Sequence, residues 1–308
     1  MAQATGKVCV TGAGGYLGSW VVKHLLSNNY TVHATVRQPG DAKYAHLNQL
    51  ERASHNLQLF KADLLDYDSL LYTKISKRII LISLETSVEV IEPAVKGTLN
   101  VLKACVEAKV KRVVVVSSRG AVALNPRWPV GQIKDEACWS DKEHCAATKK
   151  RRVNFEFAKS SGLDVVTVCP SLILGPLLQP TINASSLALV RLLKGYDTLE
   201  EKSRMIVEFK VRMIVDVRDV AEALLLVYEK AEAEGRYICM AHLTNPRDLV
   251  DKLRSIFPQY DYPKRFIEGG EEDILSSEKL QRLGWSYRPL EETLVDSIES
   301  YKKAGILD

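Results

Sequence analysis

The stretch Val10–Gly18, VTGAGGYLG, decides the fold that this sequence predicts. It follows the strand-like run KVCVT (7–11), opens the helical run YLGSWVVKHLLS, and places Gly12, Gly15 and Gly18 at G-x-x-G-x-x-G spacing. Glycine at such positions lets the chain turn tightly, approach a pyrophosphate closely and pack the helix on the sheet. The amides of the helix N-terminus then point at the anion. The stretch therefore predicts a dinucleotide-binding strand–turn–helix unit.

The chain on either side of this unit alternates strand-like and helical segments. Its strand-like runs are apolar throughout, which is typical of a parallel sheet covered by helices on both faces. We therefore predict an α/β, Rossmann-type, doubly wound parallel sheet. The further strands are expected at YTVHATV (30–36), within LQLFKADL (57–64), and at RIILIS (78–83), KRVVVVSS (111–118) and LDVVTVC (163–169), with a long amphipathic helix at about 89–108.

The end of the second predicted strand indicates which cofactor is bound. NAD binders usually place an acidic residue about 20 residues beyond the glycines, where it holds the ribose 2′-hydroxyl. This chain has Arg37 there, nineteen residues after Gly18. An arginine suits a 2′-phosphate, and Lys43 lies a short loop away. NADP(H) is therefore favoured over NAD(H), the alternative being a solvent-facing Arg37.

The regular alternation breaks after Pro170. We predict an NADP-binding Rossmann domain over 1–170, completed by about 213–241, and a smaller, interwoven C-terminal substrate lobe over 171–308. Helices are expected in that lobe near 185–194, 246–256, 276–283 and 290–303.

Composition excludes several classes of function. Apolar residues make up 46% and charged residues 26%, and the net charge is +4, so we expect an ordinary globular protein without a nucleic-acid surface. The run Lys149–Arg152 reads as a solvated helix face. The six cysteines form no C-x-x-C pair or zinc pattern, so we expect reduced thiols and no metal. Neither a signal core nor a membrane-length apolar run is present, and we expect a cytoplasmic protein without membrane contact.

With these motifs in view, the chain resembles extended short-chain dehydrogenases/reductases, most closely the plant cinnamoyl-CoA reductase and dihydroflavonol reductase family. The likeness covers nearly the whole chain and includes VCVTGAGGYLGSWVVKHLL, DEACWSDKE, LDVVTVCPSLILGPLLQPTINASS and VDVRDVAEALLLVYE. The resemblance implies a Rossmann fold, NADPH, and reduction of a small aromatic thioester, aldehyde or ketone. Oligomeric state stays open.

The resemblance also implies the site residues. The family's catalytic serine corresponds to Ser118, whose hydroxyl would bond the substrate oxygen; a plain strand-end cap is the alternative. Asp63 would accept from the adenine amino group, or would cap a turn. The implied cofactor contacts are Gly12, Gly15, Tyr16, Leu17, Gly18, Arg37, Lys43, Asp63, Leu64, backbone groups of Pro170, Ser171 and Leu172, and Ser185.

The family's tyrosine and lysine are missing. The tyrosine donates a proton to the carbonyl, and a lysine four residues later lowers its pKa from about 10. No tyrosine occurs between Tyr72 and Tyr196. Counting forward from DEACWSDKE puts the two positions near Arg152 and Glu156, and counting back from EFAKSSGLD puts them near Glu143 and Ala147. The family's active-site loop after the fourth strand is also shorter here; strand and loop together read RIILISLETSVEV (78–90).

Three hypotheses follow from these losses. The first is a family reductase that is impaired or inactive, as a divergent paralogue, a splice product or a misjoined gene model. The second is a non-catalytic NADP(H)-binding sensor or partner protein without a substrate. The third is an active enzyme with another proton donor, for which His144 is a candidate; Lys149 or Lys150 would reach the ribose but supply no phenol.

Overall fold

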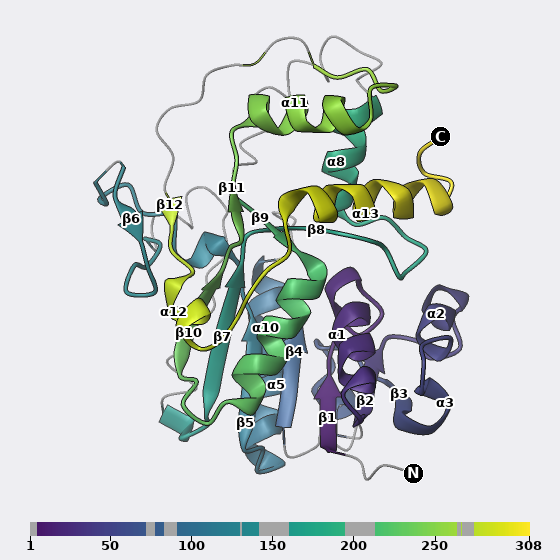
Figure 1. Cartoon of the computed structure of the whole chain (residues 1–308). Helices are drawn as coiled ribbons and strands as arrows, with labels where there is room; N and C mark the ends of the chain where they lie inside the picture. The colour runs from purple at the N-terminus through teal and green to yellow at the C-terminus, as the bar shows by residue number, and fades with distance from the viewer. Residues whose placement is uncertain are drawn as a thin grey trace.

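The computed structural model describes residues 5–71, 78–82, 91–129, 131–141, 160–194, 213–263, 266 and 274–308 (Figure 1). These residues form a large parallel sheet with helices on both faces and a smaller lobe above the carboxyl ends of its strands. The α/β Rossmann-type fold class predicted from the sequence is confirmed.

The central sheet has the strand order β10-β7-β5-β4-β1-β2-β3, and every neighbouring pair is parallel. The order reverses between β1 and β4, which makes this boundary the topological switch point where open α/β sheets bind ligands. The seven strands are β1 (Gly6–Val10), β2 (Tyr30–Val36), β3 (Leu57–Lys61), β4 (Arg78–Ile82), β5 (Arg112–Val116), β7 (Val165–Pro170) and β10 (Gly235–Cys239).

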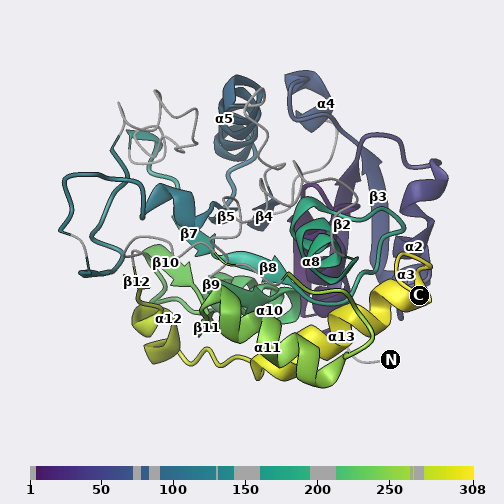
Figure 2. The ribbon, with the colours of Figure 1, turned by 90° about the horizontal axis from the view of Figure 1, so that it is seen from above.

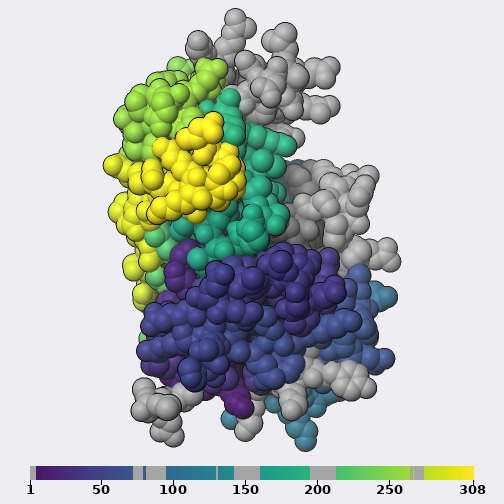
Figure 3. All heavy atoms as spheres, turned by 90° about the vertical axis from the view of Figure 1, so that its right-hand side faces the viewer, coloured from purple at the N-terminus to yellow at the C-terminus, as the bar shows by residue number. Residues whose placement is uncertain are grey.

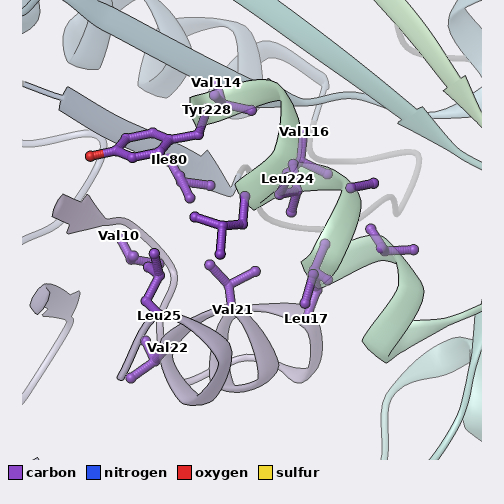
Figure 4. Close-up of a cluster of buried hydrophobic side chains, with 14 of the residues drawn as sticks. Val10, Leu17, Val21, Val22, Leu25, Ile80, Val114, Val116, Leu224 and Tyr228 are labelled. Carbon is purple, nitrogen blue, oxygen red and sulfur yellow. The ribbon is translucent and has the colours of Figure 1, made fainter. Parts of the chain in front are cut away.

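Apolar side chains on both faces of the strands fix this sheet in the interior. Successive strand residues point to opposite faces. Val114 and Val116 lie in the core beneath one helical layer, whereas Val113 and Val115 lie in the core beneath the other. All five residues of β5 are buried. Figure 4 shows the first of these cores, where side chains of α1 and α10 meet those of β1, β4 and β5.

Helices cover both faces of the sheet. Figure 2 shows α4 and α5 on one side and α10 on the other, and α1 packs beside α10. The helix α1 presents apolar residues at three- and four-residue steps, as the sequence predicts. The covering helices are α1 (Tyr16–Ser27), α4 (Tyr67–Leu71), α5 (Ile91–Glu107) and α10 (Val217–Glu229), with the short η1 (Ala42–Tyr44), α2 (Ala45–Asn48) and α3 (Ala53–Asn56) after β2.

The lobe has its own core of apolar side chains, including the fully buried Tyr301. In Figure 3 the lobe, in green and yellow, lies above the purple and blue N-terminal half. It comprises the sheet β11-β9-β8, with β8 (Leu172–Leu174), β9 (Met213–Asp216) and β11 (His242–Leu243), and the helices α8 (Ala184–Lys194), α11 (Pro246–Ile256) and α13 (Leu290–Lys303). The remaining elements are η3 (Arg119–Ala121), β6 (Ile133–Lys134), β12 (Ile274–Leu275) and α12 (Glu278–Arg282).

Hydrogen bonds and ion pairs tie the lobe to the Rossmann layer. The Tyr16 hydroxyl donates to the Gly175 carbonyl at 2.9 Å, and the Trp20 indole donates to the Pro176 carbonyl at 2.8 Å. On α10, Arg218 pairs with Asp296 of α13 at 2.6 Å. The two regions are thus in direct contact, and the proposed division at residue 170 with an interwoven lobe stays a prediction.

A second charged contact lies at the same junction. The buried Asp219 carboxylate accepts from the Arg288 backbone N–H at 2.9 Å and pairs with the Arg288 guanidinium. Burial nevertheless raises the pKa of Asp219 to about 6, because the desolvation of the charged form outweighs these contacts.

Candidate functional site

The glycine turn lies at the carboxyl end of β1, beside the switch point. Gly12 has φ +62°, in the left-handed region that glycine adopts without strain. A methyl group on Gly18 would place its Cβ 2.2 Å from the Gly12 carbonyl oxygen and 2.9 Å from the Ala13 Cα. Both glycines are therefore required by the backbone itself, as the spacing predicts.

The first turn of α1 is suited to an anion. Gly15 is the N-cap residue, no side chain caps the turn, and no acidic residue lies in it. The amides of such a turn carry positive partial charge. The backbone of this turn therefore fits the pyrophosphate of a dinucleotide.

The side chains of Tyr16 and Leu17 do not face this cradle. Both are buried, and the Tyr16 hydroxyl reaches the lobe at Gly175. Any cofactor contact of these two residues therefore involves their backbone groups. The Tyr16 and Trp20 bonds to the lobe could not be predicted from the sequence, because they join residues more than 150 positions apart.

Two cations lie beyond the end of β2. Arg37 is exposed immediately after the strand and makes no ion pair with any residue that the structure describes. Lys43 lies in η1, where its ammonium pairs with the Asp41 carboxylate at 3.0 Å. The pair raises the pKa of Lys43, while hydrogen bonds from Lys43 lower the pKa of Asp41. The positions of both cations suit a 2′-phosphate, but Asp41 competes for Lys43.

Asp63 and Leu64 form the loop after β3. The Asp63 carboxylate accepts from the Leu65 N–H at 2.9 Å, so its side chain caps this turn. The Leu64 carbonyl accepts from the Asn100 side chain of α5 at 2.9 Å. Of the two hypotheses for Asp63, turn capping is therefore seen directly, and the adenine contact stays a prediction.

Ser118 lies two residues beyond β5, at the same edge of the sheet. Its Oγ accepts from the Gly120 N–H at 3.2 Å and so caps η3. A hydroxyl has one donor and two acceptor positions, so capping leaves the Ser118 proton for a substrate oxygen. Both hypotheses for this serine are compatible with that geometry.

Ser140 holds the loop that begins at Ser118. Its buried Oγ donates to the Gly120 carbonyl at 2.8 Å and accepts from the Leu124 N–H at 2.8 Å. The sequence prediction did not include Ser140. It belongs to the family-like segment DEACWSDKE, and that membership was the only signal that could have pointed to it.

The predicted contacts near the nicotinamide lie at the end of β7 and in the lobe. The Ser171 N–H donates to the Cys239 carbonyl at 3.0 Å and is therefore already paired. The Ser171 hydroxyl is buried without a partner among the described residues. Pro170 ends β7, Leu172 begins β8, and Ser185 is half-buried in α8. Their cofactor contacts stay predictions.

Several predicted features lie outside the described residues. These are the 142–159 segment, in which the tyrosine and lysine are missing and which contains His144, Lys149 and Lys150, and the shortened loop over 83–90. Within the described ranges, no group of three or more His, Cys, Asp and Glu side chains is arranged to hold a metal ion. None of the helices in those ranges is both long and apolar enough to cross a membrane.

Comparisons with known proteins agree with this geometry. Residues 8–239 match the family described as the NAD dependent epimerase/dehydratase family. The chain is 39% identical to cinnamoyl-CoA reductase 1 of Petunia hybrida, with 97% of this chain and 93% of that protein covered. It is 38% identical to cinnamoyl-CoA reductase 1 of Arabidopsis thaliana, covering 100% and 92%. The crystal structure of vestitone reductase from alfalfa (Medicago sativa) superposes with a TM-score of 0.81 at 30% identity, covering 98% of this chain and 99% of that one.

Proposed function

The chain belongs to the NAD dependent epimerase/dehydratase family, and on that premise we propose that it binds NADP(H) while its reductase chemistry is impaired. The observation that carries the first part is the backbone cradle at Gly12 and Gly18. The observation that carries the second is the absence of any tyrosine between Tyr72 and Tyr196.

Arg37 supports NADP(H) over NAD(H). The position where NAD binders usually carry a carboxylate holds a guanidinium, exposed and without an ion pair among the described residues. A guanidinium can bond two phosphate oxygens at once, whereas a neutral diol gains little from it. When bound, the reduced cofactor supplies the hydride; the glycine turn, Arg37 and Lys43 orient it.

Ser118 alone does not supply reductase chemistry. Its hydroxyl can donate a hydrogen bond to a substrate oxygen, which stabilises charge that develops there. A proton must still reach that oxygen, and a serine hydroxyl is a far weaker acid than a phenol paired with an ammonium group. The chain therefore retains one group for orienting the substrate and lacks the usual proton donor.

The length of one alignment supports the expectation that this sequence is shorter than its relatives within the matched range. The alignment with the Arabidopsis cinnamoyl-CoA reductase runs over 330 positions, and this chain has 308 residues. At least 22 positions of that alignment therefore have no residue in this chain. A loss of that size is equivalent to several helical turns.

The relatives indicate which substrates to try. Two of them are named cinnamoyl-CoA reductases, so we propose an aromatic thioester or carbonyl compound as the ligand beside Ser118. The alternative is a non-catalytic NADP(H)-binding sensor or partner protein, for which the missing phenol is the supporting observation.

The test has two stages. The purified protein is first titrated with NADPH and NADH by fluorescence or calorimetry, and NADPH should bind more tightly. NADPH oxidation is then followed with hydroxycinnamoyl-CoA thioesters, aldehydes and dihydroflavonols. Binding without turnover supports the proposal, and turnover that Ser118→Ala abolishes would show a working reductase.

A further inference from the structure

Tyr44 lies directly on the glycine turn. A methyl group on Gly14 would place its Cβ 2.2 Å from the Tyr44 Cδ1 and 2.3 Å from its Cε1. The φ of Gly14 is outside the left-handed region, so its backbone would accept another residue. A side chain on residue 14 can therefore be accommodated only if the Tyr44 ring moves, whereas at Gly18 the conflict is with the backbone.

A second contact holds the same segment against α1. The His46 Nδ1 lies 3.0 Å from the Lys43 carbonyl oxygen, and its Nε2 lies 2.8 Å from the Ser19 Oγ. A carbonyl only accepts, so Nδ1 donates to the Lys43 carbonyl. The Ser19 hydroxyl also lies 2.8 Å from the Gly15 carbonyl, so its one proton is shared between that carbonyl and the His46 Nε2. Burial lowers the pKa of His46, which favours this neutral form.

The Tyr44 ring also contacts the cationic side of the site. The Lys43 ammonium lies 5.0 Å from the ring centroid, within the range of a cation–π contact. Tyr44 thus touches the turn suited to a pyrophosphate on one side and the lysine suited to a 2′-phosphate on the other. Gly14 and Lys43 lie in different segments of the chain, and the Tyr44 ring contacts both.

We propose that Tyr44 is a positioning residue for NADP(H), setting the glycine turn and Lys43 at the separation that the two phosphate groups require. This inference rests on the proposed NADP(H) binding. A ligand that two chain segments hold at once binds more tightly when the segments are already in place, because less ordering occurs on binding. The contact with Gly14 is made by ring carbons, so we expect the hydroxyl to contribute little to the position of the turn.

A double-mutant cycle tests the contact by NADPH fluorescence titration. Tyr44→Ala should weaken NADPH binding about tenfold, whereas Tyr44→Phe, which keeps the ring, should change it less than about twofold. Gly14→Ala should weaken binding about tenfold in the wild-type background, because the new methyl group displaces the ring. In the Tyr44→Ala background, Gly14→Ala should have less than about a twofold effect, since the ring is gone.

Each other outcome contradicts the inference. Additive effects of the two substitutions would mean that the Gly14 methyl blocks the cofactor directly, and an unchanged affinity in Tyr44→Ala would remove the role of the ring. If Tyr44→Ala does not fold by circular dichroism, Tyr44→Leu takes its place with the same expectation. A wild-type chain that fails to bind NADPH overturns the proposed function, and this inference with it; wild-type binding with additive variants overturns the inference alone.

Discussion

On the β1–β2 side of the carboxyl edge, the glycine turn, Arg37 and Lys43 follow two neighbouring strands and suit the phosphates of one ligand. On the β5–β7 side, Ser118 and the Ser171 hydroxyl lie at the strand ends, and no tyrosine occurs between Tyr72 and Tyr196, the range where the family carries its catalytic phenol. Under the proposed function, phosphate binding and proton transfer depend on different segments of this fold. One can be lost from the sequence while the other is retained.

Gly18→Ala, in the glycine turn after β1, should have the largest effect on stability and on NADPH binding. Its Cβ would lie 2.2 Å from the Gly12 carbonyl oxygen, and neither backbone segment can move away without disturbing the turn. We expect the free energy of unfolding to fall by about 3 kcal/mol or more, with loss of NADPH binding. Chemical denaturation measures the first quantity and fluorescence titration the second.

Gly40→Ala is the matched control for Gly18→Ala, because nothing lies within 4 Å of its added Cβ. It should leave both stability and affinity nearly unchanged. Equal unfolding free energies and equal NADPH affinities in the two variants would show that the Gly18 contact does not constrain the turn.

Arg37→Asp should have the next largest effect. Replacing the guanidinium by a carboxylate removes a phosphate partner and adds repulsion, so NADPH affinity should fall about 100-fold while NADH affinity rises or holds. Lys103→Asp, an exposed charge reversal on α5, is the control and should leave the ratio of the two affinities unchanged. An Arg37→Asp protein that still prefers NADPH would refute the role given to Arg37.

Asp219, at the junction with the lobe, gives a smaller effect that depends on pH. Its folded pKa of about 6 is above the ordinary value of 3.8, so the folded state holds this proton more tightly than the unfolded chain does. Stability from this group is therefore greatest below pH 4 and falls as the pH rises to about 6. Against Asp219→Asn, the wild-type chain should lose about 1–2 kcal/mol across that window. Urea unfolding at pH 4, 5, 6 and 7 measures it, and a constant difference would contradict the raised pKa.

Ser118→Ala should have the smallest effect on binding. It removes one cap of a short 3₁₀ turn, so stability should fall by less than about 1 kcal/mol, and NADPH affinity should stay within about twofold. Titration of the variant beside the wild-type protein checks this. A large loss of NADPH affinity would show that Ser118 takes part in cofactor binding, which would contradict its assignment to the substrate.

The sequence predicted the sheet and the turn because both depend on local patterns. The apolar run of β5 requires burial on two faces, and the glycine spacing requires a tight turn whatever lies elsewhere. The sequence prediction missed Tyr44, His46 and Ser140. Each contacts a residue distant in the sequence, namely Gly14, Ser19 and Gly120 respectively.

Asp63 shows a second limit of sequence-based prediction. A carboxylate after a strand suits a ligand, a turn or both, and only the structure, with the Leu65 amide 2.9 Å away, shows that Asp63 makes the turn contact. For the tyrosine and lysine positions, the sequence remains the sole source, because residues 142–159 lie outside those that the structure describes.

A single-turnover measurement tests the central claim most directly. The protein, in excess over NADPH, is mixed with a hydroxycinnamoyl-CoA thioester while the absorbance of the reduced nicotinamide is followed. We expect the bound NADPH to keep its absorbance, with Ser118→Ala giving the same trace as the wild-type chain. A decay of that absorbance in the wild-type protein, lost in Ser118→Ala, would contradict the claim that this chain binds the cofactor without the means to complete the reduction.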